Sequence, residues 1–162
     1  MADLDSRTVA APYLRLAEKY DTPNGDVVAL WDLRIQQPNT SRVPPEVIHS
    51  IEHSLIYAMR TLIDPRAFLA APMGCSTGFY ISAINITDYD EMESVIAAAL
   101  TWLGEQDAIP WADVEHCGMY LSHSLDGAKE LAARLLSQRA EWADPGPNAR
   151  ELTDDITADS PE

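Results

Sequence analysis

"PEVIHSIEHSLIYAMRTL", residues 45–62, carries the pattern from which the fold and the site are interpreted. Placed on a helix, five of its apolar side chains fall within a stripe of roughly 80°: Ile48, Ile51, Leu55, Met59 and Leu62. Pro44 and Pro45 can open such a helix, because proline is tolerated in the first helical turn. The stretch therefore predicts one amphipathic helix over residues 45–62, with the stripe facing the core.

Two of the four histidines of the chain lie on a neighbouring arc of this helix. His49 and His53 project from consecutive turns, as ligands of one metal ion must, and Glu52 lies between them in angle. The alternative is a pair of surface histidines on an exposed helix face. The H-x-x-E-H pattern favours metal binding, and it is also the pattern of inverzincin peptidases, which need a further ligand, usually a later carboxylate.

The two cysteines, Cys75 and Cys117, lie far apart in the sequence and are expected to be free thiols in a reducing compartment. Cys117 is a candidate third ligand, because thiolates bind Zn²⁺ and Fe²⁺ well and a His₂Cys set leaves one position open for substrate. Cys75 lies between two glycines in "PMGCSTGFY", where the backbone can approach a ligand closely. A small buried hydrophobic role is the alternative for Cys75.

Turn signals and hydrophobic periodicity predict an α+β fold, with a largely antiparallel β-sheet packed against helices. The expected strands are part of 8–16, then 27–35 after the turn at 21–26, then 79–86 and a short one at 115–123. The expected helices are 45–62, one starting at Thr87 or Asp88 and ending near residue 103, and one after Ser124 that ends near residue 142. Residues 1–143 form one predicted domain. Residues 144–162 hold six acidic residues against one arginine, which predicts a disordered tail.

The net charge of −15 argues against nucleic acid and anionic membranes as partners, because both would be repelled. The polar start "MADLDSRT" is no signal peptide, and no apolar run is long enough to span a bilayer. A cytoplasmic location is therefore expected. His116 is expected to be exposed or to support the ligands from outside, and not to be a fourth ligand, because adjacent strand residues point to opposite faces. His123 is expected to support the site or to cap the last helix.

Taken together, the motifs resemble those of the S-ribosylhomocysteine lyase (LuxS) family over about residues 4–140. The segments that carry the resemblance occur in the family's order: APYLR, TPNGD, HSIEH, PMGCSTGFY and HCGMYLSHSLDGAK. The resemblance implies a LuxS-like metalloenzyme that forms a homodimer, with active sites at the subunit interface. It implies one divalent ion per subunit, Fe²⁺ or Zn²⁺, held by His49, His53 and Cys117.

The resemblance further implies that Glu52 and Cys75 transfer protons, and that Arg34, Asp5 and Ser6 lie in the substrate-binding set. The small-molecule substrate would be S-ribosylhomocysteine. Aldose–ketose isomerisations would move the carbonyl along the sugar, and β-elimination would release homocysteine and 4,5-dihydroxypentane-2,3-dione, the precursor of the quorum-sensing signal autoinducer-2. No redox cofactor is needed for such chemistry.

Four positions depart from the family pattern around the sugar and the cysteine loop. Ser6 stands where many members have histidine, Gln36 where they have cysteine, Leu69 where they have aspartate, and Ala71 where they have serine. Losing hydrogen-bonding groups can shift substrate discrimination strongly. A diverged enzyme that isomerises or cleaves a related ribosyl or pentose substrate is therefore the first alternative, and a catalytically inactive metal-binding dimer is the second. The peptidase hypothesis is the weakest of these interpretations, because it gives the PMGC and HCG segments no role.

Overall fold

Four antiparallel strands form the central sheet, in the order β1-β2-β4-β3. In the computed structural model, which describes residues 3–152, they span Tyr13–Asp21 (β1), Val27–Arg34 (β2), Ala67–Pro72 (β3) and Gly78–Ile84 (β4). β1 and β2 form a hairpin around the expected turn, where Gly25 has a φ of 91°. That left-handed conformation is one glycine adopts without steric cost.

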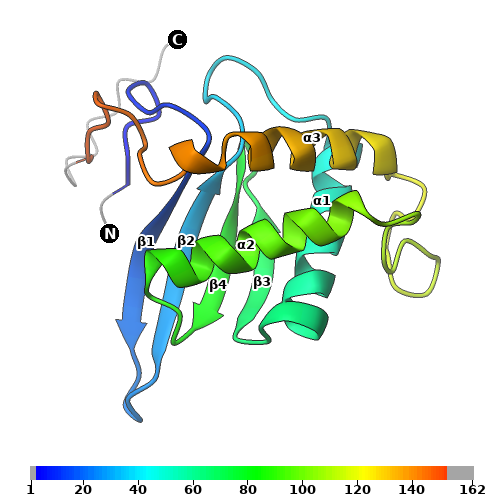
Figure 1. The fold of residues 1–162 in the computed structure, drawn as a ribbon, viewed down its shortest axis with the longest axis horizontal. Helices are drawn as coiled ribbons and strands as arrows, with labels where there is room; N and C mark the ends of the chain where they lie inside the picture. The colour runs from blue at the N-terminus through cyan, green and yellow to red at the C-terminus, as the bar shows by residue number, and fades with distance from the viewer. Residues whose placement is uncertain (1–2, 153–162) are drawn as a thin grey trace.

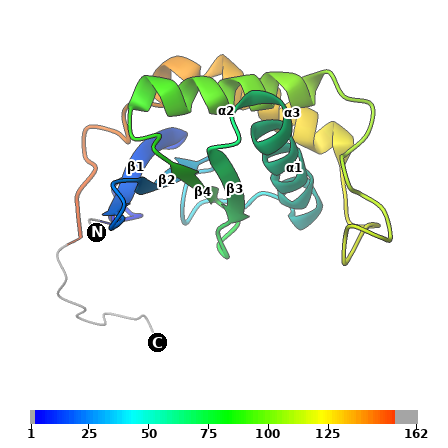
Figure 2. The ribbon, with the colours of Figure 1, turned by 90° about the horizontal axis from the view of Figure 1, so that it is seen from below.

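Three helices pack against this sheet: α1 (Pro45–Ala58), α2 (Tyr89–Gly104) and α3 (Leu125–Ser137). α2 and α3 lie across one face of the sheet, and α1 lies beside the edge strand β3 (Figures 1 and 2). The expected caps are present. The Asp88 side chain accepts a hydrogen bond from the Glu91 N–H, and the Ser124 side chain accepts one from Gly127. The predicted α+β class with an antiparallel sheet is confirmed.

The two faces of the sheet differ in what they bury. Ala29, Trp31 and Leu33 of β2 face the helices and belong to the main core. Asp32 and Arg34 alternate with them and therefore point to the opposite face. On that face no helix of the described residues covers the sheet (Figure 2). The large side chains of Leu69, Tyr80 and Ile84 are 37–40% exposed.

Several predicted boundaries are wrong. β1 begins at Tyr13 and runs to Asp21, later than the expected 8–16, and β3 was not anticipated. Residues 115–123 form turns instead of a strand, and α3 ends at Ser137 before a short 3₁₀ turn, Arg139–Glu141. Beyond Ala58 the first helix widens into a π-helical turn, Met59–Ile63. The wider turn changes the phase of the stripe, so Leu62 is 52% exposed instead of buried.

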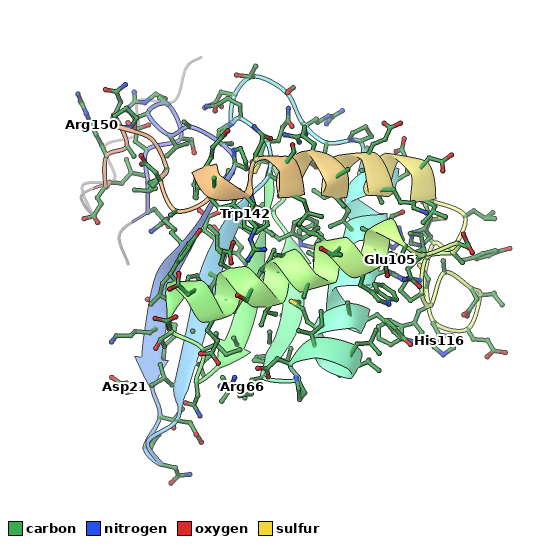
Figure 3. The ribbon with its side chains drawn as sticks, viewed as in Figure 1. Asp21, Arg66, Glu105, His116, Trp142 and Arg150 are labelled. Atoms are coloured by element: carbon green, nitrogen blue, oxygen red, sulfur yellow. The ribbon has the colours of Figure 1, made fainter. Side chains whose placement is uncertain are left out.

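The start of the predicted acidic tail, residues 144–152, runs beside the N-terminal segment. The Ala10 N–H donates to the carbonyl of Pro145, and the Asp5 N–H donates to that of Arg150. An isolated antiparallel bridge joins Leu4 to Glu151, and Arg150 lies on this side of the molecule (Figure 3). The remainder of the expected tail, 153–162, lies outside the described residues. Within the described range, no helix is long and apolar enough to cross a membrane.

Candidate functional site

Three histidines and one cysteine converge where α1 meets the loop 105–124. His49 and His53 come from α1, while Cys117 and His123 come from the loop just before α3. One ligand atom from each residue lies within 4.8 Å of all the others. Cys117 is 8% exposed, so the sulfur lies in a largely dehydrated position. The structure thus brings the predicted residues His49, His53 and Cys117 together, and it adds His123.

Hydrogen bonds to backbone carbonyl groups indicate which ring nitrogen of His49 and of His53 carries a hydrogen. His49 Nδ1 lies 2.8 Å from the carbonyl oxygen of Ser122, and His53 Nδ1 lies 2.9 Å from that of Pro110. A carbonyl oxygen only accepts hydrogen bonds, so both Nδ1 atoms must donate. In the neutral form of each ring, Nε2 then carries the lone pair through which histidine binds a metal.

The same reasoning fixes the tautomer of His123. Ser50 Oγ donates its only hydrogen to the carbonyl oxygen of Glu46 at 2.7 Å. It must therefore accept from His123 Nδ1, which lies 3.2 Å away. Burial and the neighbouring His49 and His53 lower the pKa of His123 to about 4, which keeps this ring neutral. His123 thus also presents a lone pair at Nε2.

These donors fit a divalent ion. The Cys117 sulfur lies 3.4 Å from His49 Nε2 and 3.7 Å from His123 Nε2. Two ligands of one tetrahedral Zn²⁺, at about 2.1 and 2.3 Å from the ion, would be roughly 3.6 Å apart. Imidazole nitrogens and a thiolate suit Zn²⁺ and Fe²⁺. The group His49–His53–Cys117–His123 can therefore bind a metal ion.

The loop that presents Cys117 is built on one carboxylate. Asp113 Oδ1 accepts hydrogen bonds from the backbone N–H groups of Glu115 and His116, and the Cys117 N–H donates to the Asp113 carbonyl. His116 is exposed on the outside of this loop (Figure 3) and pairs with Asp113 at 2.8 Å. The expected exposure of His116 is correct, but its cause is this turn, because no strand forms here.

Cys75 lies in a separate cavity of about 370 Å³ on the uncovered face of the sheet. Its lining comes from the N-terminal segment, the sheet, the loop after β3 and the C-terminal segment: Asp3, Leu4, Ser6, Arg15, Asp32, Arg34, Met73, Gly74, Cys75, Tyr80 and Leu152. None of the four cluster residues lines it. Two predicted substrate residues, Arg34 and Ser6, therefore share a cavity with Cys75.

A chain of hydrogen bonds connects Arg34 to Cys75 through Thr77. Arg34 donates from Nη1 to Thr77 Oγ1 at 2.9 Å, and Thr77 Oγ1 lies 2.9 Å from the Cys75 sulfur. Since Oγ1 accepts from Arg34, its hydrogen is available for the sulfur. Burial raises the pKa of the Cys75 thiol, but hydrogen bonds from Thr77 and the charge of Arg34 outweigh it and bring the pKa below its ordinary value. The arrangement favours the thiolate.

The remaining predicted residues, Glu52 and Asp5, are absent from the lining of the Cys75 cavity. Glu52 is half-buried on α1, between His49 and His53 in sequence. Asp5 does not line the Cys75 cavity, and its carboxylate binds the Arg7 guanidinium at 2.8–3.2 Å. Sequence reasoning did not assign Asp32 to the site, although it stands two residues before Arg34 and is 3% exposed at the cavity. Only its burial marks it, and burial is not visible in the sequence.

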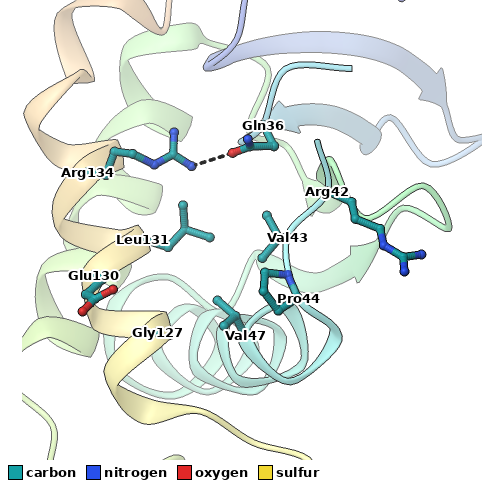
Figure 4. Close-up of a pocket in the computed structure, with 9 residues that line it drawn as sticks. All are labelled: Gln36, Arg42, Val43, Pro44, Val47, Gly127, Glu130, Leu131 and Arg134. Carbon is teal, nitrogen blue, oxygen red and sulfur yellow. Dashed lines mark hydrogen bonds between the residues drawn. The ribbon is translucent and has the colours of Figure 1, made fainter. Parts of the chain in front are cut away.

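A second hollow of about 400 Å³ lies between α3 and the segment that precedes α1. Arg134 donates from Nη2 to Gln36 Oε1 across it at 3.0 Å, while Val43, Val47 and Leu131 supply apolar walls (Figure 4). Gln36 is one of the departures from the family pattern, and here it serves as a contact of α3. None of the predicted catalytic or metal-binding residues lines this hollow.

Comparison with known proteins assigns the chain to a family. The family model described as S-ribosylhomocysteinase (LuxS) matches residues 2–145. The chain is 39% identical over 142 residues to an S-ribosylhomocysteine lyase of Staphylococcus saprophyticus, covering 88% of this chain and 90% of the relative. It is 41% identical over 140 residues to that of Dichelobacter nodosus and 40% over 140 residues to that of Listeria monocytogenes, covering 86% of this chain and 90% of each relative. With its convergent imidazoles, its thiol and this likeness over most of its length, the chain belongs to the S-ribosylhomocysteinase (LuxS) family.

Proposed function

We propose that the protein is a metal-dependent S-ribosylhomocysteine lyase. In this reaction isomerisation moves the carbonyl along the carbon atoms of the sugar. Loss of the C4 proton then expels the C5 thiolate. The products are homocysteine and 4,5-dihydroxypentane-2,3-dione. Family membership and the names of the relatives support this substrate. The observation that carries the proposal is the convergence of His49, His53, Cys117 and His123, whose ligand atoms all lie within 4.8 Å of one another.

His49, His53 and Cys117 are the proposed metal ligands, with His123 beside them. Bound Fe²⁺ or Zn²⁺ would supply Lewis-acid polarisation of a carbonyl or hydroxyl oxygen, which acidifies the neighbouring C–H. The backbone carbonyls of Ser122 and Pro110 accept hydrogen bonds from Nδ1 of His49 and His53. These bonds hold the two imidazoles in the tautomer that binds a metal through Nε2. A cytoplasmic location would keep Cys117 and Cys75 reduced.

Cys75 and Glu52 are the proposed proton carriers. The Cys75 thiolate, favoured by Thr77 and Arg34, would take and return protons on one side of the sugar chain. Glu52 would do so on the other side, from its position between two metal ligands. Arg34 and Ser6, which share the cavity with Cys75, would bind the substrate. For Asp5, the ion pair with Arg7 favours holding the N-terminal turn over direct substrate contact.

The active site is proposed to form between two copies of the chain. In one chain the Cys75 cavity and the His/Cys cluster are separate, yet both kinds of group must reach one sugar. The uncovered sheet face exposes Leu69, Tyr80 and Ile84, and the loop carrying Cys117 exposes Val114, Met119, Tyr120 and Leu121. Large apolar side chains exposed on these two regions support an interface with another chain. A homodimer would cover it and bring the Cys75 cavity of one copy to the cluster of the other.

Thiol release from S-ribosylhomocysteine tests the proposal. The metal-loaded native protein is expected to release homocysteine, detected with a thiol reagent, and Cys75→Ala is expected to lose this activity while retaining its metal. A protein that binds metal and exchanges solvent hydrogen into a sugar, but releases no thiol, would instead be a diverged isomerase. A protein with neither activity would be an inactive metal-binding dimer. Asp113→Asn is the control for indirect effects on the site. It changes the loop that carries Cys117 without removing a proposed metal ligand.

A further inference from the structure

The cavity that holds Cys75 contains two buried polar atoms whose hydrogen-bonding capacity is unused. Asp32 Oδ2 accepts from the Tyr13 hydroxyl at 3.0 Å and from Arg34 Nη2 at 3.2 Å. Asp32 Oδ1 has no partner among residues 3–152, and neither has Arg34 Nε. The Asp32 side chain is only 4% exposed. Both residues line the cavity, so a group that enters it can reach them.

An unsatisfied buried carboxylate oxygen is unusual. Most buried polar atoms in proteins have a partner, and leaving one without costs roughly 1–3 kcal/mol, more when the group is charged. Arg15 Nε also lies 3.8 Å from Asp32 Oδ2 as an ion pair, but no hydrogen bond from residues 3–152 reaches Oδ1. The missing donor is therefore expected to come from whatever occupies the cavity.

The numbers of free donors and acceptors select the kind of group. Thr77 and Asp32 each take one hydrogen from Arg34 Nη1 and Nη2, and the single hydrogen of the buried Nε has no partner among residues 3–152. A carboxylate has no hydrogen to donate to Asp32 Oδ1, and an ammonium group has no lone pair to accept from Arg34 Nε. One free acceptor beside one free donor instead matches a hydroxyl, which donates one hydrogen and accepts another.

The sheet register places this pair close to the reactive cysteine. Asp32 pairs with Tyr80 on β4, and Arg34 pairs with Gly78 at the start of the same strand. The guanidinium that binds Asp32 also binds Thr77, whose hydroxyl contacts the Cys75 sulfur. A hydroxyl between Asp32 and Arg34 would therefore belong to the part of the substrate that Cys75 acts on.

We infer that Asp32 is a substrate-binding residue: its Oδ1 accepts the hydrogen of a sugar hydroxyl, and the oxygen of that hydroxyl accepts from Arg34 Nε. This inference rests on the proposed function and adds to it a residue outside the predicted site. Asp32→Asn keeps the shape of the side chain but replaces the free acceptor with a donor, beside the donor that Arg34 already supplies. Binding of a hydroxyl in that position is then lost.

The test measures binding in the Cys75→Ala background, where turnover is blocked, by calorimetry with S-ribosylhomocysteine. Adding Asp32→Asn is expected to raise the Kd by about 10- to 100-fold, the usual effect of one hydrogen bond to a charged group. The Kd for homocysteine, which lacks the sugar, is expected to stay within about twofold. The control is Tyr13→Phe in the same background. It removes the bond to Oδ2 and should lower the melting temperature, while leaving the Kd for S-ribosylhomocysteine within about threefold.

An unchanged Kd in folded Asp32→Asn protein would overturn the inference and mean that only water occupies the position. If that variant does not fold, 2-deoxy and 3-deoxy analogues of the substrate bound to Cys75→Ala protein decide. At least one must bind about tenfold more weakly than the parent compound, and equal affinities for all three overturn the inference. Absence of thiol release by the native protein would instead refute the lyase itself, whereas thiol release with an indifferent Asp32 would refute only the inference.

Discussion

Replacing Thr77 by valine should raise the pKa of Cys75. Thr77 Oγ1 lies 2.9 Å from the Cys75 sulfur and also accepts from Arg34, so valine removes the donor and disconnects the guanidinium. A hydrogen bond to a charged group contributes about 1.5–3 kcal/mol. Cys75 is exposed, and solvent screening reduces this to about 1 kcal/mol. Losing this stabilisation of the thiolate should raise the pKa of Cys75 in the variant.

The rate of alkylation by iodoacetamide, measured from pH 5 to about 10, reports this pKa as its midpoint. Because the pKa of Cys75 in the native protein is below its ordinary value, its thiolate should persist to lower pH than in the variant. Peptide mapping separates Cys75 from Cys117, which is buried. The midpoint is preferable to a single rate, because a thiolate of higher pKa is also more nucleophilic, and this partly hides the change.

Two matched variants make the reasoning refutable. Thr77→Ser keeps the hydroxyl and should restore the native midpoint. Thr101→Val makes the same substitution in α2, where the threonine hydroxyl only binds the carbonyl of Ala97, and should change nothing at Cys75. An unaltered midpoint in folded Thr77→Val protein would show that Thr77 does not stabilise the thiolate.

Three further outcomes are expected. Cys117→Ala should lower metal affinity by more than the roughly 10- to 100-fold typical of outer ligand partners, measured by metal analysis after dialysis, whereas exposed His116→Ala should retain metal. Gly78→Ala places a Cβ 2.7 Å from the Leu33 carbonyl oxygen, so urea unfolding should show a loss of about 1–3 kcal/mol. Gly104→Ala, with nothing within 4 Å of the new atom, should cost nothing. Ending the chain after Asn148 removes the Arg150 and Leu152 backbone pairs with Asp5 and Asp3 and the Leu152 wall of the cavity. This truncation should lower the free energy of unfolding by about 1–3 kcal/mol. It should also change the KM without changing the metal content. A KM equal to that of the full chain would contradict this role for Leu152.

Local patterns predicted the elements whose formation depends on local physics. The stripe of α1 and the caps at Asp88 and Ser124 involve contacts within one or two turns, and the structure has them. The strand at 115–123 was wrong because Asp113 gathers the following N–H groups into turns, a competition that apolar composition does not reveal. β3 was missed because a short strand is stabilised by its pairing with β4, and its sequence alone carries little signal.

By itself, the sequence determined that two imidazoles would leave one helix together, because a spacing of four residues brings side chains to the same side of any α-helix. The motifs and their order along the sequence also indicated Cys117 as the partner of these two imidazoles and Cys75 as a separate reactive thiol. Only the tertiary structure decided that His123 joins the first group and that Asp32 lies buried with a free oxygen beside Arg34. Those contacts join residues distant in the sequence, such as His123 with Ser50 and Asp32 with Tyr13, or depend on burial. Such relations arise only when the sheet, the helices and the loop before α3 have packed.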